Sequence, residues 1–559
     1  MSTNKPWKSL RSLQEPFNDA FNYRSRKEKE LFNKLFLITE SLEKCLSPST
    51  YFLMGEKGAG KTAYAVYLEN NNLDNNKCQV TTMTETQYAR FINLKKAGKL
   101  EYSDYANIWR SMLLFLVGHL IINKSKGVFS KITGKYNNLE KSIEMWTRNA
   151  LNPEIESAFE AITSDKFDLE FGKKGVAKAG ATETSSEAEK IPRLKHHLLE
   201  TEMELKSAIS SLKLKDSHVL FVDGIDYRPE RVSYREYLEC IKGLSEAAWQ
   251  LNTEFFNGIR DSKGRIKIVL LVRPDVFHAL NVYNSNSRLQ DNTVYLDWAT
   301  NEKEYKSSPL FEVSGRYFSR QQSFEVAPED AWNNYYRDND LGGLIFKKLL
   351  KQTFQKPRDI LTFIKITREI QISSGKGDWT AFQDGAHANA KFTRAFSDYL
   401  LGEARNYSAF YMTQEDFRIY LKFFHYLNGK SRFSFDEFDE AYNEFSKWAK
   451  GEKIRAKEYL HDSESLLQFF YDVNIIGYSE ETEDSGEGYY HWSYRERSPN
   501  NISPKVKAVN KLMINPGIAK ALDIGKVFTK NKSTAQKPRK RKPKNMKNRR
   551  YHKGNKPNQ

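Results

Sequence analysis

The stretch Gly55-Glu-Lys-Gly-Ala-Gly-Lys-Thr62 decides the fold class of this 559-residue chain. It satisfies the pattern G-x-x-x-x-G-K-[S/T], in which glycines let backbone N–H groups wrap around a row of phosphates. Lys61 supplies a positive charge for the outer phosphates, and the Thr62 hydroxyl is a ligand for Mg²⁺. The predicted nucleotide-binding residues are therefore Gly55, Glu56, Lys57, Gly58, Ala59, Gly60, Lys61 and Thr62.

Short apolar runs flank this loop and recur along the chain. A helical pattern over residues 62–68 follows the loop and would place its positive N-terminus beneath the phosphates. Apolar runs that alternate with helices indicate a parallel sheet covered on both faces. We therefore predict an α/β fold with the parallel sheet of a P-loop NTPase, whose strands are residues 51–54, 79–83, 219–222, 266–272 and 293–296.

Two carboxylates follow the third of these runs. Asp223 ends an apolar strand, where its carboxylate is expected to bind the water shell of Mg²⁺ opposite Thr62. Hydrolysis also needs a group that orients water, and the residue after Asp223 is Gly224 rather than a glutamate. Asp226 is the nearest substitute, and a role as a turn residue is the alternative.

Two arginines lie at places suited to reporting a third phosphate. Arg273 ends the fourth predicted strand, and Arg358 opens a helix after the sheet. A planar guanidinium pairs bidentately with a phosphate, so both are candidate catalytic residues together with Asp223 and Asp226. The alternative for each arginine is an ordinary surface salt bridge.

The net charge of +17 is concentrated at one end of the chain. Residues 530–559 hold 13 Lys and Arg and no Asp or Glu, which leaves 75 basic against 71 acidic residues and a net charge of +4 elsewhere. We expect this tail to be disordered, because it cannot bury an apolar core. It suits nonspecific contact with nucleic acid, and a solvated solubility tail is the alternative.

Other features of composition exclude several classes. The cysteines Cys45, Cys78 and Cys240 have neither metal-site nor disulfide spacing, which favours a reducing cytoplasm. The apolar stretch 113–122 is too short to span a bilayer and predicts a buried helix. The polar N-terminus lacks a signal core, so we expect no membrane association.

The chain after residue 400 changes character. Thr413 with Asp416 and Ser434 with Glu437 are typical of helix starts, and a third helix is predicted over 463–472. A hairpin follows, in which Tyr490, Trp492 and Tyr494 alternate on one strand face, and a closing helix is expected after the Asn-Pro-Gly at 515–517. This order predicts a winged helix, with an ordinary helical domain carrying one hairpin as the alternative.

These observations divide the chain into five parts. A helical lead-in precedes the ATPase core, the core is split by a helical insertion with a loop or weak hairpin at 172–192, and a winged-helix-like domain and the basic tail follow. The predicted bounds are 1–45 for the lead-in, 46–85 and 216–400 for the core with its lid, 86–215 for the insertion, 401–528 for the winged helix and 529–559 for the tail.

Four segments together carry a family resemblance. G-E-K-G-A-G-K-T, F-V-D-G-I-D, L-L-V-R-P-D and K-P-R-D-I-L occur in that order and resemble bacterial STAND- and AAA-like P-loop ATPases. The segments D-A-F-N-Y-R-S-R-K-E-K-E-L-F and R-L-Q-D-N-T-V-Y-L-D-W are similar to the FunZ-type ATPases of temperate phages and defence islands. The resemblance covers about residues 15–528.

The resemblance implies a nucleotide-controlled switch, often oligomeric, that excludes infecting phage. ATP and Mg²⁺ are the implied cofactors, and Lys61, Thr62, Asp223, Arg273 and Arg358 match the ligand-sensing positions. The chain departs from the family where Gly224 replaces a glutamate, and 162 positions separate Lys61 from Asp223. The residues between them form either a sensing part or a partner-binding part.

Two other functions are alternatives to the switch. A DNA- or RNA-stimulated motor or loader would bind nucleic acid through the winged helix and the basic tail. The near-neutral body weakens that hypothesis, because a motor channel is itself basic. A scaffold that binds nucleotide without hydrolysis is a third hypothesis, and the absence of an N-K-x-D segment disfavours a GTPase.

Overall fold

A computed structural model of the chain describes residues 6–83, 102–125, 134–148, 187–230, 232–337, 344–481 and 488–524. The predicted disordered tail lies outside these residues. So does most of the predicted loop or hairpin at 172–192, whose last six residues belong to a helix, α9 (Glu187–Ser210).

The predicted parallel sheet is present and has five strands. They are β1 (Phe52–Gly55), β2 (Asn76–Thr82), β3 (Ser217–Asp223), β4 (Ile266–Val272) and β5 (Thr293–Leu296). Their order across the sheet is β2-β3-β4-β1-β5, and every neighbouring pair is parallel. The α/β prediction is confirmed at this level, and all five strands lie within a few residues of the predicted runs.

The strand register brings the predicted site residues to one edge of the sheet. Met54 pairs with Val272, and Val222 pairs with Leu270, so β1, β3 and β4 end at nearly the same level. The loop after Gly55 and the side chains that follow β3 and β4 therefore share the carboxyl edge, where ligands bind in open parallel sheets.

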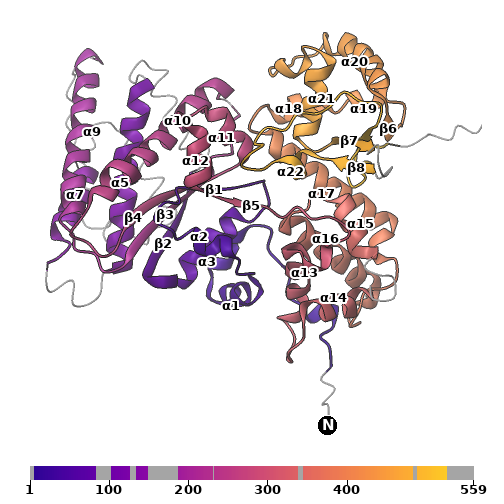
Figure 1. The fold of residues 1–559 in the computed structure, drawn as a ribbon, viewed down its shortest axis with the longest axis horizontal. Helices are drawn as coiled ribbons and strands as arrows, with labels where there is room; N and C mark the ends of the chain where they lie inside the picture. The colour runs from indigo at the N-terminus through magenta and orange to yellow at the C-terminus, as the bar shows by residue number, and fades with distance from the viewer. Residues whose placement is uncertain are drawn as a thin grey trace, which may run out of the picture.

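Helices cover both faces of the sheet. On one face pack α1 (Arg26–Leu35), α2 (Glu40–Lys44) and α3 (Lys61–Asn71), with a short turn of helix at Ala20–Arg24. On the other pack α5 (Tyr102–Ser125), α9, α10 (Tyr234–Gln250), α11 (Pro274–Leu280) and α12 (Ser285–Asp291). In Figure 1, α5, α9 and α7 (Asn137–Arg148) lie at the end of the molecule far from the C-terminal elements.

The predicted buried helix at 113–122 lies within α5. This helix is long and apolar enough to cross a membrane, but 78% of its most apolar window is buried inside the protein. Its side chains form part of the core beneath α10, including Trp109, whose indole N–H donates to the Cys240 carbonyl at 3.0 Å. The apolar composition of α5 is therefore explained by packing.

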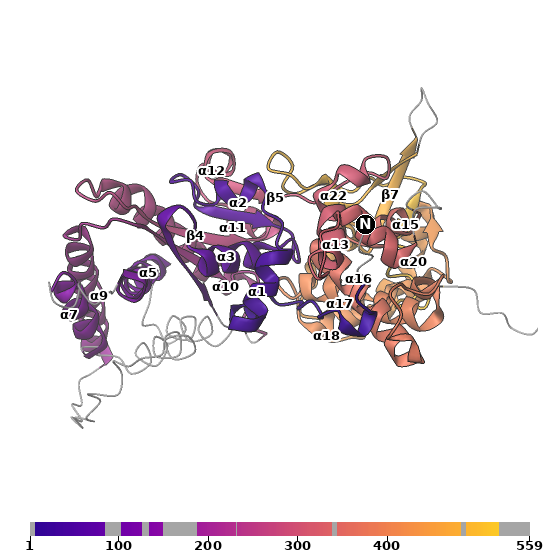
Figure 2. The same ribbon diagram turned by 90° about the horizontal axis from the view of Figure 1, so that it is seen from below.

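The described residues from Pro309 to 524 form a second body, which we call the helical body. It begins with α13 (Pro309–Ser319), α14 (Pro328–Tyr336), α15 (Leu344–Gln352), α16 (Pro357–Gln371) and α17 (Ala390–Ser408). It continues with α18 (Gln414–Tyr420), α19 (Phe423–Tyr426), α20 (Phe435–Ala449), α21 (Ser463–Asp472) and α22 (Ser493–Glu496). One apolar core runs through all of it, and residue 400 falls inside α17. Figure 2 shows this body beside the sheet.

A four-stranded antiparallel sheet completes the helical body. It consists of β6 (Arg432–Phe433), β7 (Ile476–Glu481), β8 (Gly488–His491) and β9 (Leu512–Ile514), in the order β6-β9-β7-β8. The predicted helix starts are confirmed, because Thr413 accepts from the Asp416 N–H and Ser434 forms a capping box with Glu437.

Two local predictions in this region are wrong. The strand expected through Tyr494 ends at His491, because Trp492 packs against Gly477 and the chain turns into α22. Among the residues described up to 524, turns rather than the expected closing helix follow the Asn-Pro-Gly at 515–517, and the segment before them is β9.

Candidate functional site

The glycine-rich segment forms a loop between β1 and α3. Gly58 and Gly60 have φ values of +84° and +97°, which side chains other than glycine rarely adopt. A Cβ at Gly58 would lie 3.3 Å from the Cβ of Arg358, so the loop also passes close to α16. The strand, the left-handed glycines and the N-terminus of α3 give the geometry of an anion-binding site.

Thr62 and Asp223 meet beside this loop. The Thr62 hydroxyl donates to Oδ2 of Asp223 at 2.6 Å, and the Gly224 N–H donates to Oδ1 at 2.8 Å. Burial raises the pKa of the Asp223 carboxyl above its ordinary value. Two side-chain oxygens next to an anion-binding geometry are a donor set that fits Mg²⁺, which binds through one or two protein oxygens plus phosphates and water.

Gly224 follows Asp223 directly, at the position where many P-loop ATPases have a glutamate, and its backbone explains why a glycine stands here. Its φ is +86°, and a Cβ there would lie 2.4 Å from the Met83 carbonyl oxygen at the end of β2. Any side chain at this position would therefore collide with the neighbouring strand. The second carboxylate instead comes from Asp226, which lines the same cavity as Asp223.

The two loop lysines have different surroundings. Lys61 is buried and donates to the carbonyls of Gly55 at 2.8 Å and Glu56 at 3.2 Å, and burial lowers its pKa. Lys57 donates to the Asn406 carbonyl at 3.3 Å. Burial would raise the pKa of Asp226, but nearby cations, led by Lys57, hold it below its usual value. Asp226 is therefore charged at neutral pH.

A cavity of about 250 Å³ opens from the loop. Its polar end is formed by loop residues, Asp223, Asp226 and Arg358, and Trp298 closes one side by donating its indole N–H to the Ala59 carbonyl at 2.8 Å. Its other end is apolar and comes from the N-terminal segment, α3, α13 and α16: Phe17, Tyr23, Phe32, Phe36, Tyr64, Tyr317 and Leu361. A polar end joined to an aromatic end is typical of a site for a small charged ligand with a planar group.

These apolar cavity residues were not predicted. The segment Asp19–Phe32 contributed to the family resemblance, but no periodicity marks Phe17 or Tyr23 as cavity-lining. Their position depends on the N-terminal segment folding across the end of α3, where Tyr23 stacks on Phe32 with ring centres 4.5 Å apart.

The two predicted arginine sensors lie in different places. Arg358 lines the cavity and pairs with Glu403 of α17 at 3.3 Å. Arg273 is fully buried and pairs with Asp275, with Nη2 2.5 Å from Oδ2 and its guanidinium 3.8 Å from the centre of the Tyr407 ring. Of the two, only Arg358 is among the side chains that line the cavity.

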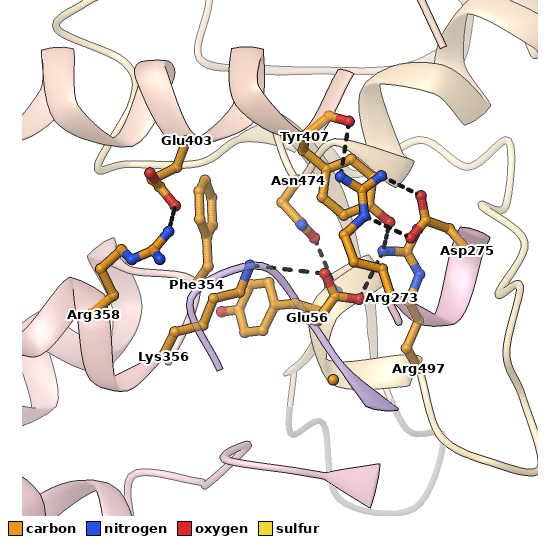
Figure 3. Close-up of polar contacts among 12 residues, drawn as sticks. Glu56, Arg273, Asp275, Phe354, Lys356, Arg358, Glu403, Tyr407, Asn474 and Arg497 are labelled. Atoms are coloured by element: carbon orange, nitrogen blue, oxygen red, sulfur yellow. Dashed lines mark hydrogen bonds and ion pairs between the residues drawn. The ribbon is translucent and has the colours of Figure 1, made fainter. Parts of the chain in front are cut away.

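Glu56 belongs to the glycine-rich loop, but it is not among the residues that line the cavity. Figure 3 shows its carboxylate facing Lys356 and Arg497. Arg497 of the helical body pairs with Glu56 Oε1 at 2.9 Å, and Lys356 lies 3.8 Å from Oε2. Arg497 also donates to the Tyr407 hydroxyl and pairs with Asp472 at 3.4 Å. Burial would raise the pKa of Glu56, but these cations keep it below its ordinary value.

No pattern in the sequence marks the contact between Glu56 and Arg497. They are 441 positions apart, and neither Arg497 nor Tyr407 lies in a motif. The loop pattern placed Glu56 among the binding residues, whereas the structure turns it toward the helical body.

Comparisons with protein-family models, with curated proteins and with solved structures returned no match for this chain. Within the described ranges, no group of three or more His, Cys, Asp or Glu is placed to hold a metal ion.

Proposed function

We propose that this protein binds ATP with Mg²⁺ and hydrolyses it slowly, as a nucleotide-controlled switch. The observation that carries the proposal is the hydrogen bond between Thr62 and Asp223, at the mouth of a cavity and beside a glycine loop that begins a helix. A phosphate loop, a hydroxyl and a strand-end carboxylate are the parts that P-loop NTPases use to hold phosphates and Mg²⁺.

Each residue has a role in this proposal. Backbone N–H groups of the loop and the charge of Lys61 bind the phosphates, while Thr62 and Asp223 hold the cation. Mg²⁺ supplies charge neutralisation for the phosphates when bound. Arg358 reaches the same end of the cavity and is the candidate sensor of the third phosphate.

Asp226 is the candidate for orienting the attacking water. It lines the cavity beside Asp223, and its pKa is held low, so it accepts a hydrogen bond from water at neutral pH. An aspartate is one methylene shorter than the usual glutamate and begins two residues further along the chain. We therefore propose slow turnover.

The aromatic end of the cavity supports binding of a nucleoside rather than a bare phosphate. Rings from Phe17, Tyr23 and Phe36 surround it, and a planar base stacks well on such walls. The chain has no N-K-x-D segment for a guanine, so we propose ATP as the ligand.

The nucleic-acid-stimulated motor receives less support. In a winged helix the third helix enters a DNA groove, yet α21 carries Glu464 and Asp472 and no Lys or Arg. The adjoining hairpin segment 480–487 contains five acidic residues. These charges repel phosphate, so nucleic-acid contact through the basic tail alone is the remaining form of that hypothesis.

A role in phage exclusion and assembly into homo-oligomers are also proposed, on the family resemblance. Cells expressing the wild type, Lys61→Ala or a deletion of residues 530–559 would be challenged with phage. We expect Lys61→Ala to abolish restriction, and full restriction by this variant would contradict the switch.

Nucleotide binding itself is tested by titrating purified protein with a fluorescent ATP analogue in the presence of Mg²⁺. We expect saturable binding that Lys61→Ala weakens at least about 100-fold, because it removes a buried phosphate-binding charge. The matched control is Lys44→Ala, whose ammonium pairs with Glu40 on the surface. No saturable binding by the wild type, or equal binding by Lys61→Ala, would overturn the proposal.

A further inference from the structure

The phosphate loop touches two different parts of the protein. Lys57, Gly58, Gly60, Lys61 and Thr62 line the cavity. Glu56, which lies in the same loop, does not line the cavity and is held by the helical body instead. The loop therefore lies between the predicted ligand and a second structural unit.

The contact on the helical-body side is buried and charged. Glu56 and Arg497 are exposed by only 6% and 3%, and Arg497 has two further partners in Asp472 and Tyr407. A buried carboxylate that loses its cation is strongly unfavourable. The Glu56 side chain is consequently held in one position as long as the helical body stays docked.

Fixing Glu56 also fixes the part of the loop that contacts Lys61. The Lys61 ammonium donates to the carbonyl oxygens of Glu56 and Gly55. Any rotation of the Glu56 backbone would therefore move an acceptor of Lys61 and redirect the neighbouring N–H groups.

The contact around Glu56 is polar, and the junction as a whole mixes polar contacts with a small aromatic one, in which Phe410 of the helical body packs into one core of the sheet. The sheet has its own core on each face, and the helical body has a third. Across the junction, Asp275 accepts from the Tyr411 hydroxyl at 2.5 Å, and the Tyr295 hydroxyl donates to the Arg497 carbonyl at 3.1 Å. Polar interfaces between domains permit relative motion more readily than continuous cores do.

We propose that Arg497 is a positioning residue that acts through Glu56. Docking of the helical body and the affinity of the glycine-rich loop for nucleotide are thereby linked. This inference rests on the proposed nucleotide site and names how that site is regulated. Since linkage is reciprocal, nucleotide stabilises the docked body, and undocking weakens nucleotide binding by the same factor.

The test combines nucleotide affinity with hydrogen exchange of the backbone. The first variant is the neutral pair Glu56→Gln with Arg497→Met, which leaves neither charge without the other. The second is Arg497→Lys, which keeps the charge but not the planar fork. The control is Arg495→Met, because Arg495 lies in α22, which ends just before Arg497, and its guanidinium lies over the Tyr494 ring.

In the wild type we expect Mg²⁺-ATP to slow exchange across residues 493–498, which do not line the cavity. In the double variant we expect affinity to fall about tenfold or more and this protection to disappear. Arg497→Lys should fall between, and Arg495→Met should match the wild type. A merely structural Arg497 would not make exchange at 493–498 depend on nucleotide.

The outcomes separate the two proposals. Wild-type affinity in a folded double variant, or exchange at 493–498 that ignores nucleotide in the wild type, overturns the linkage alone. A wild type that binds no nucleotide overturns the site and the linkage together. If the double variant does not fold, Arg497→Lys decides, and unchanged affinity and protection in that variant overturn the linkage.

Discussion

The two sides of the glycine-rich loop, residues 55–62, are held by different kinds of interaction. On the cavity side, one short hydrogen bond joins Thr62 and Asp223, and the Lys61 ammonium donates to two backbone carbonyl oxygens. On the side of the helical body, Glu56 and Arg497 belong to a network of buried ion pairs. The cavity side keeps charged groups that a ligand can take over, whereas the other side pairs its charges within the protein.

This difference predicts different consequences of substitution. Removing a charge from the paired network leaves a buried counter-ion and lowers the free energy of unfolding. Removing a charge from the cavity side changes ligand binding and turnover, because a ligand supplies the missing partner. The largest effect is expected from the paired network and the smallest from an arginine that lines the cavity.

Arg273→Met is expected to lower the free energy of unfolding by about 3 to 5 kcal/mol, because it leaves Asp275 buried without its cation. Denaturation in urea, followed by circular dichroism, measures the change. Adding Asp275→Asn should restore part of the loss. Arg394→Met, which breaks an exposed pair with Asp398, should cost about 1 kcal/mol or less. Equal losses for Arg273→Met and Arg394→Met would contradict the comparison.

Asp359 should make the free energy of unfolding depend on pH. Burial raises its pKa to about 6, while its carboxylate accepts from the Phe354 N–H and the Tyr399 hydroxyl. Because the native state holds this proton more tightly, stability should fall by about 3 kcal/mol as the pH rises from about 4 to 7. Unfolding curves of Asp359→Asn should show a flatter profile over this window. A profile parallel to that of the wild type would rule out Asp359 as the cause.

Asp223→Asn tests the cavity side. We expect Mg²⁺-dependent phosphate release to fall about 100-fold, which corresponds to about 2.7 kcal/mol, with the free energy of unfolding little changed. The amide oxygen accepts from the Gly224 N–H and the amide NH2 donates to the Thr62 hydroxyl, but the charge that attracts the cation is lost. Asp216→Asn, just before the opposite end of the same strand, is the control, because its carboxylate pairs with Lys77 at 3.9 Å. Undiminished phosphate release by Asp223→Asn would remove Asp223 from the proposed site.

Arg358→Lys is expected to have the smallest effect. A lysine keeps the charge beside Glu403 but loses the planar fork, so ATP should bind about tenfold more weakly while ADP binds as before. Competition titrations with both nucleotides measure the ratio. A parallel loss of ADP affinity would show that Arg358 supports the loop rather than detecting the third phosphate.

Short segments of the sequence were sufficient to predict part of this protein. The loop pattern, the apolar strands and the carboxylate after β3 are local features, because periodicity and glycine placement act over a few residues. They were enough to predict the parallel sheet. They also predicted that Thr62 and Asp223 would lie together, which the 2.6 Å hydrogen bond between their side chains confirms.

Which charges face the cavity and which are paired away from it depends on long-range packing. The sequence predicts the same phosphate-sensing role for Arg273 and Arg358. In the structure Arg273 is buried against Asp275, whereas Arg358 lines the cavity. Arg497 reaches Glu56, 441 positions away, because the helical body packs beside the sheet. Such contacts depend on how whole bodies pack, and no short pattern of residues records that arrangement.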